Sequence, residues 1–596
     1  MSSTKRFPKS RFCISFLVVF IVSLSMFICH ANGGGFPHKG VVAKTAMVAT
    51  TEVETTKIVL DLLKKGWTAV DAAIATQFLM GVYEPGMTGL GGFGFEITMY
   101  SAKKEEITEL IAVGKAPSKS SAGMFEVVPG REPGLPAKVK DRANVIGHKA
   151  PLVPPMVKGL YELHKKYATK SWKELIEPAI MVAETGFKAT QPYIDNLKRA
   201  EKVLRRFPAS VEVFLHEGKI PELGQKILNK DLAKTMKIIA EKGPDVFYKG
   251  EIADSILHEL QQHVGIITKE DFSVPKLEEK KLRSFTYRGH RILIAPNLGG
   301  SALAEILNIA SNFDLSRMGC QSPESLHVLI EAMKLAFTDR YVYAADMDSV
   351  ATAIDGMFSW VYGRDQTRRI DLQKSQIFKP GDPWLYQCIG KNLVKSANAE
   401  NVKVAMGAGA HETTQFDIAD QYGNIVVFIT SLRSNFGSGV TVPGKGFVLN
   451  NGMALFDPRP GNNNSIAPHK APLANGAQVI VLKDNKPFLA MGAPGGRGII
   501  TATAQVLINM FDYGMSLQDA IDTPRVHSEA VGKLVAVESR ISESTRKALE
   551  AMGHQIKVFP DYHGYFARIE AIQINHDAGL LFGASDPRAN GAAMGY

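Results

Sequence analysis

The chain has 596 residues, of which 45% are hydrophobic and 21% are charged. These are ordinary globular values, so the chain can bury a large core and is not disordered, and its length suggests roughly three or four domains. The net charge falls from +10 to +6 when the four cations of a basic leader, Lys5, Arg6, Lys9 and Arg11, are left out. Because no block of Lys and Arg is interleaved with aromatic residues, the composition argues against nucleic-acid binding.

Residues 1–31 have the pattern of a secretory signal peptide. A basic start is followed by an apolar run over 12–29 and then by small and polar residues. Since the apolar run is somewhat long, a signal anchor that spans the membrane is the alternative. We therefore expect a secreted protein or, alternatively, a type II membrane-anchored protein with an extracellular body.

The spacing of cysteine and histidine predicts neither a disulfide scaffold nor a metal site. Two of the four cysteines lie in the leader, which leaves Cys320 and Cys388 either to pair in an oxidising compartment or to stay as thiols. We expect no metal and no cofactor. The one glycosylation sequon beyond the leader makes Asn463 a candidate glycosylation site.

In chain order, the first part of the chain predicts mostly helices. Apolar residues recur at helical spacing between residues 50 and 78, and Thr68 with Asp71 predicts a capping box. The glycine-rich stretch 84–94 precedes a strand instead of opening a helix, which argues against a nucleotide-binding loop. The remaining expectations are helical segments over 152–186 (with a helix start at Pro178), 226–265, 302–310 and 325–343, and a buried strand over 291–295.

From residue 413 onward, strands and glycine turns prevail. Residues 365–410, basic at first and then small and polar, predict an exposed loop. Residues 417–424 predict a strand that runs into a tight turn, and 425–430 predict a buried strand. Helices are expected near 501–511 and 542–552. On local evidence alone, the pair Thr413-Thr414 indicates only strand propensity.

A series of short motifs extends along nearly the whole chain beyond the leader. They are Val70-Asp71-Ala72-Ala73, Gly89-Leu90-Gly91-Gly92, Phe247-Tyr248-Lys249-Gly250-Glu251-Ile252-Ala253, Glu331-Ala332-Met333-Lys334-Leu335-Ala336-Phe337, Glu412-Thr413-Thr414, Gly492-Ala493-Pro494-Gly495-Gly496, Ala584-Ser585-Asp586-Pro587-Arg588 and Gly595-Tyr596. As an ordered set they resemble the γ-glutamyltransferase family of N-terminal-nucleophile hydrolases.

The resemblance implies an α/β fold, a four-layer αββα sandwich built from two chains of one precursor. It implies self-cleavage between Glu412 and Thr413. The products would be a large subunit, 32–412, and a small subunit, 413–596, which pair non-covalently. Thr413 would become the N-terminus of the small subunit.

The resemblance also assigns the catalytic roles. A threonine hydroxyl is a weak nucleophile unless a base takes its proton, and cleavage would free the Thr413 α-amine, whose pKa lies near neutrality. Ser431 stands where family members usually carry a threonine that hydrogen-bonds the nucleophile, and serine keeps that donor and acceptor. Gly495 and Gly496 would form the oxyanion hole with backbone N–H groups. The expected partners are a small-molecule acyl donor and a water or amine acceptor.

The contacts that would hold a γ-glutamyl head group depart from the family pattern. Val113 stands where the family has an arginine for the α-carboxylate, and Leu455 stands where it has an acid for the α-amino group. Lys115 lies near but lacks the bidentate fork of an arginine. A site that loses its ionic partners discriminates strongly against the original ligand. The departures predict poor γ-glutamyl turnover.

Three other positions are candidates for substrate binding in the changed pocket, namely Arg433, Asn451 and Asn475. Arg433 replaces an asparagine of the family, and Asn475 belongs to an Ala-Asn pair where the family has two serines. Arg433 either faces a distal carboxylate on the acyl group, as in acylase-like relatives, or is a solvated arginine at a strand end.

Three functions are therefore open at this point. The first is a secreted, self-processing amide hydrolase or acyltransferase with altered acyl specificity. The second is a secreted toxin or binding protein with a cell-surface target, such as blood cells or platelets, because relatives of this family occur in some arthropod venoms. The third is an ordinary γ-glutamyl transpeptidase or glutathione hydrolase whose pocket is rebuilt from other residues.

Overall fold

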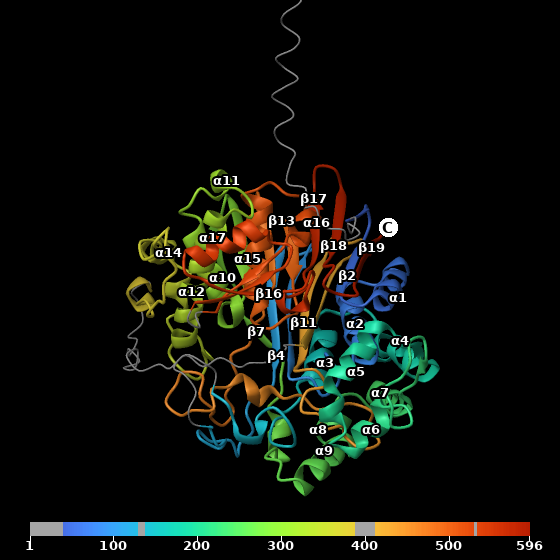
Figure 1. Cartoon of the computed structure of the whole chain (residues 1–596). Helices are drawn as coiled ribbons and strands as arrows, with labels where there is room; N and C mark the ends of the chain where they lie inside the picture. Colours follow the sequence, from blue (N-terminus) through green and yellow to red (C-terminus); the bar gives the residue numbers. More distant parts are fainter. Residues whose placement is uncertain (1–39, 129–136, 388–411, 530–532) are drawn as a thin grey trace, which may run out of the picture. The chain divides into compact units, whose positions relative to one another are not determined.

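Two seven-stranded sheets carry the fold (Figure 1). The structure is a computed structural model that describes residues 40–128, 137–387, 412–529 and 533–596. Sheet A has the strand order β1 (Val41–Ala43), β18 (Leu580–Ser585), β17 (Glu570–Asn575), β13 (Lys486–Gly492), β12 (Val479–Lys483), β9 (His290–Ile294) and β8 (Arg283–Tyr287). Sheet B has the order β19 (Ala592–Gly595), β2 (Met47–Thr50), β10 (Glu412–Ala419), β11 (Ile425–Arg433), β3 (Gly94–Ser101), β4 (Glu106–Val113) and β7 (Glu278–Lys280).

Helices cover the outer face of each sheet, and the inner faces meet in a core of their own. On sheet B, α1 (Val53–Lys64), α2 (Ala69–Tyr83) and α3 (Met156–Tyr167) contact the strands, and α4 (Trp172–Thr185), α7 (Lys230–Lys242) and α9 (Glu251–Gln262) belong to the same apolar cluster. On sheet A, α10 (Ser301–Ala310) and α15 (Gly498–Phe511) contact the strands, and α12 (Pro323–Tyr343) packs on α10. Between the sheets lie Met47, Val427 and Ile480. The four layers confirm the predicted αββα sandwich.

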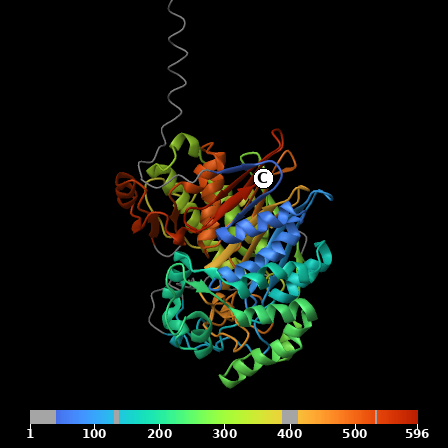
Figure 2. The ribbon, with the colours of Figure 1, turned by 90° about the vertical axis from the view of Figure 1, so that its right-hand side faces the viewer.

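The remaining elements surround these layers. Figures 1 and 2 show that many of the helices from the stretch 156–262 gather toward one end of the sheets. The elements outside the four layers are α5 (Gln191–Leu204), α6 (Pro208–Phe214), α8 (Asp245–Tyr248), α11 (Leu315–Met318), α13 (Ile354–Met357), α14 (Trp360–Thr367), α16 (Leu517–Asp522) and α17 (Glu543–Ala551), with the short strands β5 (Phe187–Lys188), β6 (Lys226–Ile227), β14 (Val526–His527), β15 (Leu534–Glu538) and β16 (Gln555–Phe559).

Both sheets combine strands from before residue 413 with strands from after it. In sheet B, β10 and β11 lie between β2 and β3, and in sheet A, β1, β8 and β9 flank strands of the C-terminal part. The expected change from a helical part to a strand-rich part is therefore only half right, because the first part supplies half of the strands. The described residues belong to one compact unit, not to roughly three or four domains.

Most local predictions are confirmed at the level of elements. The capping box of α2 is present, with Thr68 Oγ1 accepting from Asp71 N–H at 3.2 Å and Asp71 Oδ2 accepting from Thr68 N–H at 3.1 Å. The helix start at Pro178 is wrong. Ser171 caps α4 and Glu174 completes its capping box, so the helix begins at Trp172 and contains Pro178.

Within the part of the chain that the structure describes, no helix combines the length and apolarity needed to cross a membrane. The predicted signal peptide or anchor, 1–31, lies outside the described residues, and so does half of the predicted exposed loop, 388–410.

Candidate active site

Thr413 lies in a bulge at the start of β10. In the ladder with β11, Glu412 is opposite Arg433 and Thr414 is opposite Thr430, so the register shifts at Thr413. Phe416 and Ile418 face the helices, whereas the alternate residues of β10 face sheet A. The buried Thr413 side chain therefore points toward the space between the sheets.

The Thr413 hydroxyl is held by a neighbour on β11. Thr413 Oγ1 donates a hydrogen bond to Ser431 Oγ at 3.1 Å. Ser431 Oγ also accepts from the backbone N–H of Arg433 at 2.7 Å. The second bond fixes the serine rotamer, so that one of its lone pairs faces the threonine. The predicted nucleophile and its predicted hydroxyl partner are thus brought together.

A pocket opens at this pair. Its lining combines the candidate catalytic residues with a mostly apolar wall. The lining residues are Phe93, Gly94, Phe95, Glu96, Thr413, Ile429, Thr430, Ser431, Arg433, Leu455, Ala474, Asn475, Gly476, Gly496 and Ile499.

The predicted oxyanion loop connects β13 to the start of α15. Gly495 and Gly496 have positive φ angles of 141° and 61°. A Cβ at Gly495 would lie 2.5 Å from Ala567 Cα, so only glycine fits there. Gly496 lines the pocket, whereas Gly495 does not belong to its lining. The positive end of the α15 dipole lies directly after the loop and favours a developing negative charge.

Polar contacts around Thr413 hold β10 on both sides. Arg568 Nη2 donates to the Thr413 carbonyl oxygen at 3.0 Å. On the helix side, the Thr414 hydroxyl bonds to Glu84 and, at 2.6 Å, to Thr51 Oγ1. Sequence reasoning missed Thr51, Glu84 and Arg568, because these contacts join segments far apart in the chain and only the strand order reveals them.

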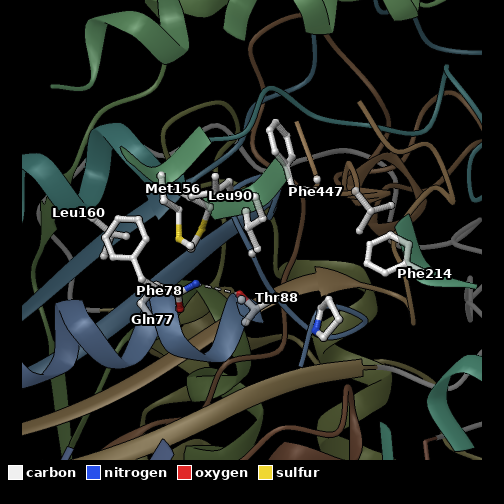
Figure 3. A pocket seen from close by; sticks show the side chains of 15 residues that line it. Gln77, Phe78, Thr88, Leu90, Met156, Leu160, Phe214 and Phe447 are labelled. Atoms are coloured by element: carbon white, nitrogen blue, oxygen red, sulfur yellow. Dashed lines mark hydrogen bonds between the residues drawn. The ribbon is translucent and has the colours of Figure 1, made fainter. Parts of the chain in front are cut away.

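A second cavity lies beneath the glycine-rich loop (Figure 3). Gln77 Nε2 donates to Thr88 Oγ1 at 3.0 Å, and Thr88 Oγ1 lies 2.7 Å from Thr430 Oγ1, one residue before Ser431. The chain of bonds therefore ends on the strand that carries the serine. The rest of the lining is mostly apolar and includes Phe78, Leu90, Met156, Leu160, Phe214 and Phe447. We interpret this region as a support for β11.

Arg433 reaches the pocket as a buried cation. Its side chain lines the pocket and its residue is 6% exposed, which contradicts the solvated alternative. Nη1 donates to Ser434 Oγ at 2.7 Å, and Nε has no acceptor among the described residues. Burial, together with the positive charges of Arg497 and Arg142, lowers the pKa of Arg433 to about 10. An anionic group in the pocket would relieve both effects.

Of the other two candidate substrate-binding residues, Asn475 lines the pocket and Asn451 does not. The Oδ1 of Asn475 accepts from Arg340 Nη2 at 2.9 Å. The Oδ1 of Asn451 accepts from Ser434 N–H at 3.1 Å and its Nδ2 donates to the Val145 carbonyl at 2.9 Å. The Asn451 amide therefore holds the backbone around the site.

Val113 and Leu455, which stand where the family has charged residues, also lie in apolar surroundings. Val113 and Leu455 pack on one cluster, which includes Phe93 and Phe456. Only Leu455 of this pair lines the pocket. Lys115 forms an ion pair with Glu278 at 3.3 Å, so its charge is already compensated.

Two predictions on modification fall elsewhere. Asn463 is half-buried and its Nδ2, the atom that a glycan would occupy, donates to the Val342 carbonyl at 2.7 Å. Cys320 is half-buried, and Cys388 lies outside the described residues. Glycosylation and the pairing of the cysteines stay predictions.

Two groups of side chains have metal-ligand chemistry that sequence spacing did not reveal. In the buried group, His327 Nδ1 lies 2.8 Å from His554 Nε2, and Glu331 is paired with Lys334 at 2.6 Å. In the other group, His148 bonds to Glu259 at 2.9 Å and stacks on His263. Because these atoms already bond to one another, we assign no metal to either group.

Comparisons with known proteins agree with the geometry. The family model described as Gamma-glutamyltranspeptidase matches residues 55–596. The chain is 34% identical over 557 residues to the glutathione hydrolase proenzyme of Bacillus subtilis (strain 168), covering 93% of this chain and 92% of that protein. It is 31% identical over 551 residues to the Acylase ACY 1 proenzyme of Pseudomonas sp. (strain SE83), covering 92% and 93%.

Solved structures show the same similarity. Cephalosporin acylase from Bacillus halodurans superposes with a TM-score of 0.81 at 28% identity, over 95% of this chain and 99% of that one. A γ-glutamyltranspeptidase chain from Helicobacter pylori superposes with a TM-score of 0.52 at 31% identity, over 56% of this chain and 95% of that one.

Proposed function

Because the chain belongs to the γ-glutamyltranspeptidase family of N-terminal-nucleophile hydrolases, we propose that it is a secreted amide hydrolase or acyltransferase with altered acyl specificity that cleaves itself between Glu412 and Thr413. The observation that carries the proposal is the bond from Thr413 Oγ1 to Ser431 Oγ in the wall of a pocket that Gly496 also lines. The relatives include a glutathione hydrolase proenzyme and an acylase proenzyme.

Maturation and turnover use the same hydroxyl. In maturation, Thr413 Oγ attacks the carbonyl carbon of Glu412 and its proton passes to the Thr413 nitrogen. The peptide C–N bond breaks as an ester forms, and water hydrolyses the ester. The freed α-amine of Thr413 then takes the hydroxyl proton when Oγ attacks a donor amide. The proton passes to the leaving amine, and water or another amine releases the acyl group.

The surrounding residues orient these steps. Ser431 fixes the direction of the attacking lone pair through its bond to Thr413. Backbone N–H groups of the loop at Gly495 and Gly496 stabilise the tetrahedral oxyanion, and losing one such donor typically costs about 3 kcal/mol of barrier.

The altered specificity rests on the charges in the pocket. Leu455 contributes an apolar surface where a γ-glutamyl group would need an acid, and Val113 packs on the same apolar cluster. Arg433 places a buried guanidinium with a free Nε in the pocket. An acyl group with a distal carboxylate fits this arrangement, because the carboxylate compensates the buried cation.

Self-cleavage is tested on a denaturing gel of purified wild type, Thr413→Ala and Thr413→Ser. We expect two fragments from the wild type and from Thr413→Ser, which keeps a hydroxyl, and one uncut chain from Thr413→Ala. N-terminal sequencing of the small fragment should read Thr-Thr-Gln-Phe. An uncut wild-type chain would refute the proposal.

Specificity is tested with glutaryl, hexanoyl and γ-glutamyl anilides. We expect the glutaryl donor to be favoured over the hexanoyl donor. Arg433→Gln should lower this preference by about tenfold or more, since a hydrogen bond to a charged group is lost. Robust γ-glutamyl turnover would show that the interpretation of Val113 and Leu455 is wrong.

A further inference from the structure

One side chain of the pocket has no part in the mechanism described above. Glu96 on β3 is fully buried and lines the pocket together with Thr413 and Ser431. Its Oε2 has no hydrogen-bond partner among the described residues. A buried carboxyl oxygen without a partner costs about 1–3 kcal/mol. An apolar side chain would avoid that cost, so packing does not explain Glu96.

The strand register places Glu96 beside the nucleophile on the same face of sheet B. Ser431 is opposite Gly94, and Ile429 is opposite Glu96. Alternate residues of a strand share a face, so Glu96 lies one row deeper than the row of Ser431 and Gly94, roughly 7 Å along the strand.

The segment that precedes β12 leaves room for the carboxyl group. A Cβ at Gly476 would lie 2.0 Å from Glu96 Oε2, so the glycine provides the room for this oxygen. Gln478, two residues further on, donates to the backbone oxygen of Glu96 at 3.3 Å. Burial raises the pKa of Glu96 to about 8, and a hydrogen bond from the Gln478 side chain opposes the rise.

We propose that Glu96 is a specificity-determining residue that binds an amine carried by the acyl group of the donor. The proposal rests on the proposed function of Thr413 and deepens it. An ammonium group supplies the donor that Oε2 lacks, and its charge favours the ionised carboxylate.

The position of Glu96 also separates this amine site from Arg433. Along β11, Arg433 lies beyond Ser431 on one side, whereas the residue opposite Glu96 lies on the other side. The ammonium and carboxylate of a γ-glutamyl group share one carbon atom. They cannot reach two side chains on opposite sides of the nucleophile row, which agrees with a changed acyl specificity.

The experiment compares two isosteric donors, 5-aminopentanoyl and hexanoyl anilide, which differ in an ammonium against a methyl group. We expect kcat/KM of the wild type to favour the amine donor, and Glu96→Gln to lower that preference by about tenfold or more. Gly476→Ala should act in the same direction, because its Cβ displaces the Glu96 carboxyl. Taking the ratio of the two donors cancels changes common to both, such as the ionisation of the Thr413 α-amine.

Glu109→Gln is the matched control. Glu109 is a fully buried carboxyl on the next strand, bonded to Thr98 Oγ1 at 2.5 Å, and it does not belong to the pocket lining. It should leave the donor preference unchanged. A preference that is equal in the wild type and Glu96→Gln would overturn the inference, even if both proteins cleave themselves normally.

A binding measurement keeps the inference testable if turnover is absent. Calorimetry with 5-aminopentanoate and hexanoate should show an affinity ratio in favour of the amine that Glu96→Gln lowers. An unchanged ratio would overturn the role of Glu96. Failure of self-cleavage would instead refute the proposed function of Thr413, so the two failures are distinguishable.

Discussion

Replacing Ser431 by alanine tests how the proposed nucleophile, Thr413, is oriented. The Ser431 oxygen accepts from Thr413 Oγ1 at 3.1 Å and from Arg433 N–H at 2.7 Å, and all three residues are buried. Without this oxygen, the Arg433 N–H loses this acceptor and the Thr413 hydroxyl can rotate. Each lost hydrogen bond is worth about 1 kcal/mol. If both losses appear in the barrier, cleavage slows by about 30-fold.

The assay follows conversion of the uncut chain into two fragments over time, and then kcat/KM of the processed protein with its best donor. Ser431→Thr is the control, because threonine keeps the oxygen that accepts both bonds, and it should behave like the wild type. Wild-type rates of cleavage and turnover in Ser431→Ala would refute the assigned role of the serine.

Three further predictions concern stability and are checked by denaturant unfolding. Burial raises the pKa of Asp417, so the folded state keeps a proton that the unfolded chain loses above pH ~4, and the free energy of unfolding falls as pH rises; Asp417→Asn should weaken this dependence, and an unchanged slope would contradict it. Asn451→Ala leaves two half-buried backbone groups without these bonds and should cost about 1–3 kcal/mol without changing the donor preference. Lys334→Met leaves Glu331 buried without its cation and should cost about 3–5 kcal/mol; a neutral effect would contradict the importance of this buried pair.

Features set by neighbouring residues could be predicted from the sequence. The capping box at Thr68 depends on residues three positions apart, and the strand pair around a tight turn after Asp417 depends on alternation and a glycine turn. The sequence indicated the pairing of Thr413 with Ser431 only through the family resemblance, and the register of this hairpin accounts for it.

Features set by the order of strands could not be predicted. In the sequence, nothing distinguishes Glu96 from any other acidic residue in a strand. Only its register against β11 and the room left at Gly476 place its carboxyl group in the pocket. The bond from Thr51 to Thr414 joins strands that are more than 300 positions apart in the chain. The sequence likewise did not reveal that the part before residue 413 contributes strands to both sheets, since short buried strands and helices share apolar runs.

The combination of strands from before and after residue 413 has a consequence for how a cleaved protein would behave. Before a cut between Glu412 and Thr413, unfolding and refolding involve one molecule and do not depend on concentration. After the cut, neither piece holds a complete sheet, since β10 and β11 lie between β2 and β3. Refolding then becomes bimolecular, and fragments that separate in dilute solution are lost. The cut would thus turn an equilibrium stability into a kinetic one, governed by the rate of the first unfolding step.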